Sequence, residues 1–188
     1  MSKEIITDLL KFKDKPDNDA IRFKEIVKQK LLNNEKIIYV LNNKELQDSE
    51  AEADEYFGVN ILPYYMISPT QTNVQNFLCY EVQFTEEARY NQIIKYIQLI
   101  FYVLCEQKNN IELHTGIARH DLLQALLLEE FNWSNCFGNQ IHCVSNKPSV
   151  TDNDYNTRTI IFEGKVTNGI VKTTNNSTRV FNNDGINR

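Results

Sequence analysis

The chain has 188 residues, of which 41% are hydrophobic, and a formal net charge of −5. This length predicts one domain whose core is large enough to fold without disulfides. The acidic balance argues against a general nucleic-acid-binding protein, because neutralising phosphates requires a concentrated basic surface.

The amino-terminal segment, residues 1–6, is charged and has no long apolar run. We therefore expect neither a signal peptide nor a membrane anchor, and we expect synthesis and folding in a cytoplasm. The four cysteines lie mostly within apolar patterns, which favours reduced, buried thiols over disulfides. They are Cys79, Cys105, Cys136 and Cys143.

The first third of the chain predicts helices, an exposed loop and a sheet edge. Residues 19–32 repeat apolar side chains at helical spacing, and residues 37–41 favour a helical turn over a strand. Residues 47–56 are acidic and almost without large apolar groups, so we expect an exposed loop. Pro63 and Pro69 bracket a segment that we expect to be extended at a sheet edge, since proline cannot donate to a central ladder.

Residues 77–84 alternate in polarity, as is typical of a strand in a sheet with one wet side. One face carries Leu78, Tyr80, Val82 and Phe84, and the other carries Glu81 and Gln83. Residues 86–107 predict a long helix that covers the dry face of this sheet. Its apolar positions at helical spacing are Ile93, Ile97, Ile100, Phe101 and Leu104.

The second half of the chain predicts one further helix and a pair of strands. A leucine-rich helix spans about 117–131, and residues 140–145 form a candidate strand. Residues 157–163 predict a strand whose partner is 165–172, joined by a turn at Gly164 or, in a longer register, marked by Asn168-Gly169.

The carboxy-terminal residues hold too little apolar material to fold alone. Val180 and Phe181 are the exceptions, so an ordered tail requires a partner chain that docks them. We therefore predict a single α+β domain over residues 1–172 and a polar arm over 173–188. The domain is a small antiparallel sheet packed against two main helices, with extended loops and the terminal arm.

Metal and cofactor sites are not indicated by the sequence. The histidines and cysteines that could be considered as metal ligands do not have the sequence spacing of a known metal site, and there is no Cys-x-x-Cys motif. They are His114, His120, His142, Cys136 and Cys143. His142 and Cys143 are neighbours on a candidate strand, so their side chains point to opposite faces. There is also no glycine-rich phosphate loop and no nucleophile elbow. We expect no metal, no cofactor and no enzymatic activity.

Two groups of polar residues are candidates for contact. Arg119, His120 and Asp121 begin the leucine-rich helix, where adjacent side chains diverge by roughly 100° and do not face each other. Tyr155 and Arg158, three residues apart at a strand entrance, either anchor a neighbouring subunit or are a packed loop tyrosine and a surface arginine.

The order of these elements resembles the small neck proteins of tailed bacteriophages, the head-to-tail joining and tail-terminator class. The resemblance covers roughly residues 60–170. It rests on a polar loop with Gln71-Thr72, the strand of 77–84, a long helix, the segment 116–121, the leucine-rich helix, and Tyr155-x-x-Arg158 leading into 160–162.

The resemblance implies a non-enzymatic virion protein, assembled in the host cytoplasm, that forms a ring of six or twelve copies between the portal and the tail tube. Its partners are then other copies of itself and other neck, portal or tail-tube proteins, without a membrane. DNA passes through the lumen without specific binding. The interface candidates are Arg119, Asp121, Tyr155, Arg158, Val180 and Phe181.

Two other classes stay open at this point. A regulatory or adaptor module would bind one partner with the same body and be monomeric or dimeric in isolation. A small enzyme would require Arg119, His120, Asp121 or His142 to converge in one pocket.

Overall fold

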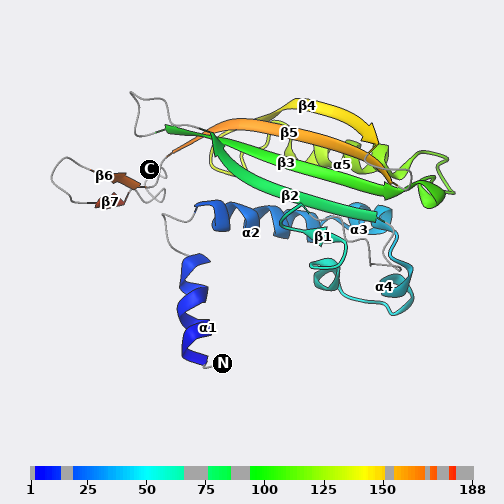
Figure 1. Ribbon diagram of the computed structural model, residues 1–188, viewed down its shortest axis with the longest axis horizontal. Helices are drawn as coiled ribbons and strands as arrows, with labels where there is room; N and C mark the ends of the chain where they lie inside the picture. The colour runs from blue at the N-terminus through cyan, green and yellow to red at the C-terminus, as the bar shows by residue number, and fades with distance from the viewer. Residues whose placement is uncertain are drawn as a thin grey trace.

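The computed structural model in Figure 1 has an α+β fold, as the sequence predicts. The described residues are 3–13, 19–65, 76–85, 94–150, 155–167, 170–172 and 178–180. The helices are α1 (Lys3–Leu10), α2 (Asp19–Leu32), α3 (Glu35–Leu41), α4 (Lys44–Asp48) and α5 (Arg119–Phe131), with 3-10 turns η1 (Lys11–Lys13), η2 (Ala53–Tyr56) and η3 (Gln107–Asn109). The strands are β1 (Ile61–Leu62), β2 (Asn76–Thr85), β3 (Ile94–Glu106), β4 (Ile141–Val150), β5 (Tyr155–Thr167), β6 (Ile170–Lys172) and β7 (Thr178–Val180).

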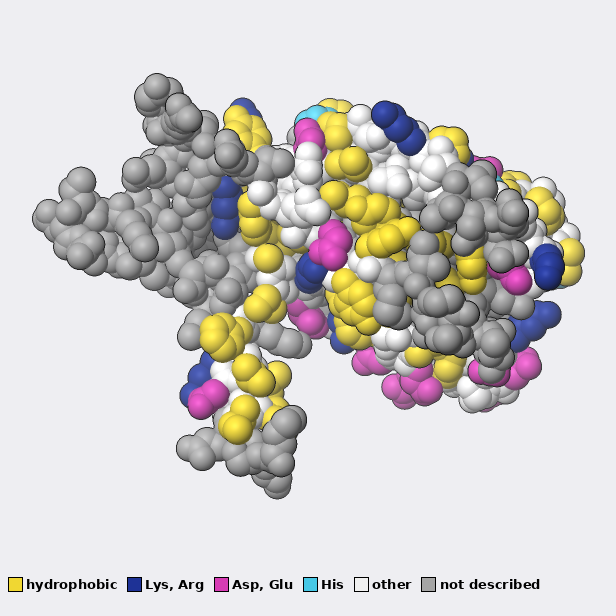
Figure 2. Space-filling model, viewed as in Figure 1, with side chains coloured by type: hydrophobic (Ala, Val, Ile, Leu, Met, Phe, Trp, Pro, Cys, Tyr) yellow, Lys and Arg dark blue, Asp and Glu magenta, His cyan; other side chains and the backbone are white. Residues whose placement is uncertain are grey.

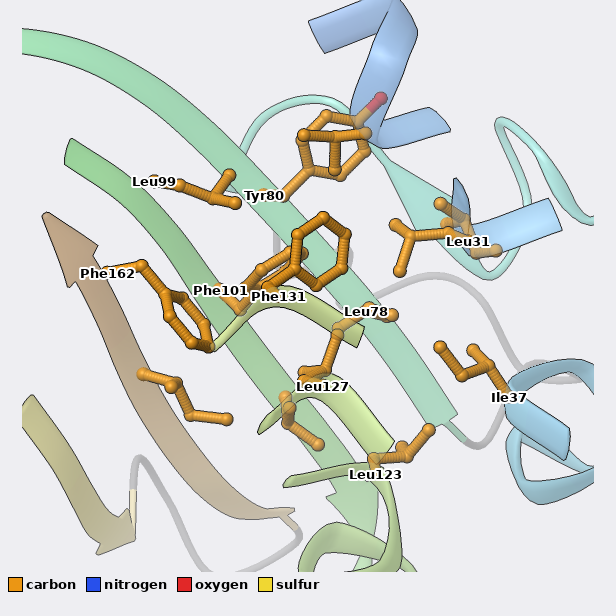
Figure 3. Packing of buried hydrophobic residues seen from close by; sticks show 14 of the residues in the cluster. Leu31, Ile37, Leu78, Tyr80, Leu99, Phe101, Leu123, Leu127, Phe131 and Phe162 are labelled. Atoms are coloured by element: carbon orange, nitrogen blue, oxygen red, sulfur yellow. The ribbon is translucent and has the colours of Figure 1, made fainter. Parts of the chain in front are cut away.

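A five-stranded sheet in the order β1-β2-β3-β5-β4 is the centre of the molecule. The short edge strand β1 is parallel to β2, and the other neighbours are antiparallel. Side chains from α2, α3 and α5 all belong to one hydrophobic cluster on one face of this sheet. Figure 3 shows Phe131 of α5 against Phe101 and near Tyr80 of the strands, with Leu31 and Ile37 approaching from the other helices on the side of Leu78. The helices therefore form a single layer.

The strand predicted at 77–84 is confirmed as β2. Leu78, Tyr80 and Val82 are buried against the helices, as the alternation requires. The opposite face is not uniformly wet, because Phe77 and Cys79 are buried there. Together with Leu62 and Leu104 they form a second, smaller apolar cluster.

The long helix predicted over 86–107 is wrong, because residues 94–106 form strand β3. This strand pairs with β5 along its whole length and, on its other side, with β2 over residues 96–105. A central strand is apolar on both faces, so alternation is lost and its apolar residues also fit a helical spacing. The apolar residues on the helix-covered face of β3 are Ile97, Leu99, Phe101, Val103 and Cys105, at every second position.

The helices expected at 19–32 and 37–41 are confirmed as α2 and α3, and the leucine-rich helix is confirmed as α5. The two helices that cover most of the sheet are thus α2 and α5. The exposed loop predicted at 47–56 is wrong in part, because it holds the end of α4 and the turn η2. Tyr56, at the end of η2, is 2% exposed and belongs to the core.

The edge strand lies slightly earlier than predicted. β1 ends at Leu62, directly before Pro63, so proline terminates the edge strand and does not lie within it. Most of the segment between Pro63 and Pro69 lies outside the described residues.

The predicted turn at Gly164 is wrong, because β5 continues through it to Thr167 and pairs with β3 and β4. Instead, the lack of a side chain at Gly164 allows Gln140 and Ile141 to lie close to the backbone of β5. A Cβ at this position would lie 2.7 Å from both the Gln140 carbonyl oxygen and the Ile141 side chain. The segment 165–172 does not pair back on β5; its last residues form β6, which pairs with β7. Asn168-Gly169 lies outside the described residues.

Three buried asparagines hold the loops at one end of the sheet. The Asn43 amide donates to Asn60 Oδ1 at 2.8 Å, and the Asn60 amide donates to the Asn76 carbonyl at 2.9 Å. The Asn76 amide in turn donates to the Leu41 carbonyl at 2.9 Å. This chain of hydrogen bonds joins the end of α3 to β1 and β2, where no apolar contact could satisfy the backbone groups.

Substitution of Asn60 with alanine is expected to destabilise the protein by about 2–4 kcal/mol, because it leaves the buried Asn43 amide without its acceptor. The measurement is urea-induced unfolding followed by circular dichroism. The control is Asn139→Ala, at an exposed position. An Asn60→Ala protein as stable as this control would contradict the role of the network.

None of the described helices is long and apolar enough to cross a membrane.

Candidate functional site

The start of α5 is the most polar part of the core, and Arg119 lies within it. Its side chain is 6% exposed. The guanidinium donates to the Val40 and Asn109 carbonyls at 3.2 Å each, and the Arg119 amide donates to the Asn110 carbonyl at 2.6 Å. Arg119 therefore fastens the end of α3 to the start of α5 within one protomer.

Asp121 and Arg158 form the ion pair of this region, 37 residues apart in sequence. Arg158 Nη2 lies 2.5 Å from Asp121 Oδ1, and its Nη1 donates to Asn146 Oδ1 at 2.9 Å. Side-chain exposure is 14% for Arg158 and 43% for Asp121. The pair joins the first turn of α5, where a carboxylate also suits the helix dipole, to strands β5 and β4.

His120 completes the cluster. Its Nδ1 contacts the Asn110 side chain at 2.8 Å, and its Nε2 lies 3.5 Å from Asp121 Oδ1, although the sequence predicted that these neighbours diverge. Burial lowers the pKa of His120, opposed by the Asp121 carboxylate and reinforced by the Arg158 guanidinium. The imidazole is therefore neutral at neutral pH, and its contact with Asp121 is not an ion pair there.

Of the four residues that the enzyme alternative names, His120 and Asp121 lie together, whereas Arg119 and His142 are engaged elsewhere. Arg119 donates to backbone carbonyls, and His142 lies on the opposite face of the sheet, stacked on Trp133 with ring centroids 5.4 Å apart. Burial raises the pKa of the Cys105 thiol to about 12, so the thiol stays protonated and is a poor nucleophile. The described residues contain no group of three His, Cys, Asp or Glu side chains that could hold a metal ion.

Tyr155 and Arg158 lie on opposite faces of the sheet. Arg158 pairs in register with Val103 on the helix-covered face, whereas Tyr155 pairs with Glu106 and packs near Phe77, with ring centroids 6.3 Å apart. The two side chains therefore cannot act together on one neighbour. The interface prediction for each of them, and for Arg119 and Asp121, stays a prediction.

Of the two predicted tail anchors, Val180 ends strand β7 and pairs in register with Ile170. Phe181 lies outside the described residues.

Glu112 is a buried carboxylate with a structural role that the sequence did not indicate. Its carboxylate is 2% exposed and accepts from the amides of His114 at 3.0 Å and Thr115 at 2.7 Å, and from the Tyr39 hydroxyl at 3.2 Å. Hydrogen bonds from the Thr115 side chain first, and then from the His114 amide, lower the pKa of Glu112 to about 2. Glu112 thereby fixes the turn before α5 and connects it to α3.

A groove runs between α3 and α5, beside Glu112. Its volume is about 520 Å³. The apolar lining comes from Tyr39, Val40, Leu122, Ala125 and Leu126, and the polar lining comes from Glu35, Lys36, Glu112, Thr115 and Glu129. Its rim includes a long Lys36–Glu129 ion pair of 3.7 Å. A mostly apolar groove with charged edges, open between two helices, suits a peptide or helix better than a charged metabolite.

A comparison with models of protein families assigns the chain to one of them. A family model named YomW matches residues 34–163, which extend from the start of α3 into β5. The chain belongs to the YomW family. No curated protein matches it significantly. The YomW family carries a Bacillus prophage name, and the chain is accordingly a phage-associated protein. The phage part of the expected resemblance is therefore confirmed, and the neck class stays a prediction.

Glutamine at position 112 is expected to destabilise this YomW-family protein at neutral pH. The folded-state pKa of Glu112 is below its ordinary value of 4.5, so ionised Glu112 stabilises the fold above that pH. This stabilisation is lost as the pH falls towards about 2, so the difference between wild type and Glu112→Gln should shrink over that range. The measurement is the free energy of unfolding between about pH 7 and about pH 2.5.

The control for this prediction is Glu55→Gln, which removes an exposed carboxylate from η2. A difference between wild type and Glu112→Gln that is constant across the whole pH range would mean that the carboxylate charge does not hold the turn.

A double-mutant cycle with Asp121→Asn and Arg158→Met should give a coupling free energy of about 1 kcal/mol. This is less than a fully buried ion pair would give, because the Asp121 side chain is 43% exposed. The same cycle on Lys36 and Glu129, each 69% exposed, is the control and should give a value near zero. Equal coupling energies in the two cycles would contradict a structural role for the Asp121–Arg158 pair.

Proposed function

We propose that this protein is a non-enzymatic structural component of a phage particle, one that forms an oligomeric ring at the head-to-tail interface. In this role it is a neck or tail-terminator subunit that joins the portal and its connector to the tail. Its partners are further copies of itself and other neck, portal or tail-tube proteins, and DNA passes through the lumen without specific binding.

The observation that carries the proposal is an apolar helix that stands away from the body. In α1, Ile5, Ile6, Leu9 and Leu10 are all between 45% and 60% exposed. Figure 2 shows these hydrophobic side chains gathered on a segment that projects beyond the globular part. Exposed apolar surface of this kind marks a protein–protein contact, since leaving it in water is unfavourable.

A second projection lies near the same end of the sheet. Strands β6 and β7 form a two-stranded sheet of their own, separate from the five-stranded sheet in Figure 1. An isolated two-stranded ribbon is marginal in water, so it suits pairing with or docking on another chain. Two arms on a small rigid body are what a ring subunit needs to reach its neighbours, and the YomW family supports a phage setting.

The charge of the chain agrees with this role. A net charge of −5 disfavours tight binding to phosphates, so DNA could move through a ring of such subunits. A structural role of this kind requires no substrate pocket, and the polar cluster at the start of α5 joins parts of the same protomer.

The test is to look for the protein in purified phage particles. Particles released from a lysogen that carries the gene are separated on a density gradient and digested for quantitative mass spectrometry. The expected result is co-purification with the portal protein at a constant ratio that corresponds to about six or twelve copies per particle, as a closed ring predicts. A phage-encoded non-structural enzyme, followed in the same gradient, is the control for adhering protein.

A chain that is abundant in the lysate and absent from the particles would contradict the virion role. That outcome would favour an adaptor that binds one partner in the host cell.

A further inference from the structure

We infer that α1 of one copy docks in the α3–α5 groove of a neighbouring copy. This inference rests on the proposed ring, because it names the contact through which copies would associate. The occupant is a second copy of this chain, and the contact is head-to-tail.

The helix α1 requires a cover. It has eight residues, fewer than the roughly 12–15 that make an isolated helix even marginally stable in water. Its exposed apolar residues, with Phe12 of η1, present roughly 500 Å² of apolar surface on the usual accessible areas of these residue types. The polar side is separate, since Asp8 and Lys11 form an ion pair of 2.6 Å there. The helix is thus amphipathic, and the face formed by Ile5, Ile6, Leu9 and Leu10 is about half exposed in the described part of the protomer.

The groove provides a surface of the matching kind. Leu122, Ala125 and Leu126 present a stripe at helical spacing along α5, facing Tyr39 and Val40 of α3. Two turns of helix, about 12 Å long, fit along α5, which is about 20 Å long. Ile5 and Leu9, or Ile6 and Leu10, are four residues apart, as anchors of a helix lying in a groove are.

The charges agree in sign. The exposed rim of the groove carries Glu35 and Glu129 against Lys36. The segment of residues 3–13 carries three lysines against Glu4 and Asp8. A weakly basic helix would therefore approach a weakly acidic rim, which favours encounter and orientation more than affinity.

The position of the two surfaces favours a neighbour over the same chain. The helix α2, about 21 Å long, lies between them, with α1 near its first residue and α3 after its last residue. Figure 1 shows α1 and α3 at opposite ends of α2. A projecting helix and a groove at different places on one chain make a heterologous contact, which repeats from copy to copy and closes into a ring when the rotation permits.

The size of the contact predicts its strength. Covering α1 on both sides buries roughly 1,000 Å² in total, below the 1,200–2,000 Å² of a standard stable interface. One such contact is weak, so free dimers should be sparse. A closed ring makes every copy both donor and acceptor of a helix and gains from the simultaneous contacts.

The experiment is site-directed cross-linking between two populations of the full chain that carry different tags. One population carries Leu9→Cys and the other carries Ala125→Cys, both at exposed positions outside the core. A short thiol-specific cross-linker is added to the mixture. Wild-type protein gives the background, which should be low because Cys79 and Cys105 are buried and burial raises the pKa of Cys105, Cys136 and Cys143.

The expected result is a product containing both tags, with a yield about tenfold above that of the matched control Asp8→Cys, which lies on the polar side of α1. Lys36→Glu, added to both cysteine variants, should raise the yield about threefold, since it makes the rim more acidic towards a weakly basic helix. Leu10→Glu or Leu126→Glu, each added to the cysteine variants, should lower the yield about tenfold, since a charge in the groove is unfavourable. Gln124→Glu, on α5 outside the groove lining, should leave it unchanged.

Each other outcome separates this inference from the ring. Cross-linking only within a chain that carries both cysteines, at high dilution, means that α1 docks on its own protomer and overturns the inference. Self-association in light scattering without a cross-link between positions 9 and 125 also overturns it and leaves the ring intact. A cross-link between these positions in a protein that is absent from phage particles supports the contact and overturns the virion role.

Discussion

The central strand β3 is the constraint on which the rest of the structure depends. It is paired on both sides over residues 96–105, and apolar side chains occupy both of its faces. Such a strand is stable only inside a sheet, so β2 and β5 must flank it, and the helices must cover at least one face. Phe101, at its middle, contacts rings from α5, β2 and β5, with centroids between 5.0 and 6.3 Å away.

The side on which the helices lie decides where the polar groups can be used. Because α5 packs over β5, its first turn brings Asp121 to Arg158, and Arg119 reaches back to the end of α3. These charged residues therefore satisfy one another or backbone carbonyls inside the protomer. In the described part of the chain, α1 and the groove between α3 and α5 are two surfaces with accessible apolar residues.

The sequence correctly predicts the elements whose apolar residues follow either strand alternation or helical spacing. It fails where the apolar residues fit both patterns. The alternation in β2 and the helical spacing in α2 and α5 are unambiguous because each element has a polar face. In β3 the second face also carries buried apolar residues, Ile100 and Leu104, so the apolar residues of this strand fit a helical spacing as well as a strand. The site is harder still. Glu112 is one of 25 carboxylate residues, and its role depends on the Gly116 turn (φ +69°) and on Tyr39, 73 positions away. The Asp121–Arg158 pair likewise depends on the packing of α5 over β5.

In the proposed ring, a weak single α1 contact would be useful, because a phage particle is built in order. If each contact were strong, subunits would form rings or filaments wherever they were made. A helix of two turns with roughly 500 Å² of apolar surface would bind weakly alone, so in the proposed ring copies would accumulate only where a partner surface holds several together at high effective concentration. The same short length that leaves α1 marginal as a free helix thus makes assembly depend on a template. Lengthening α1 by a further apolar turn would strengthen the contact and remove that dependence.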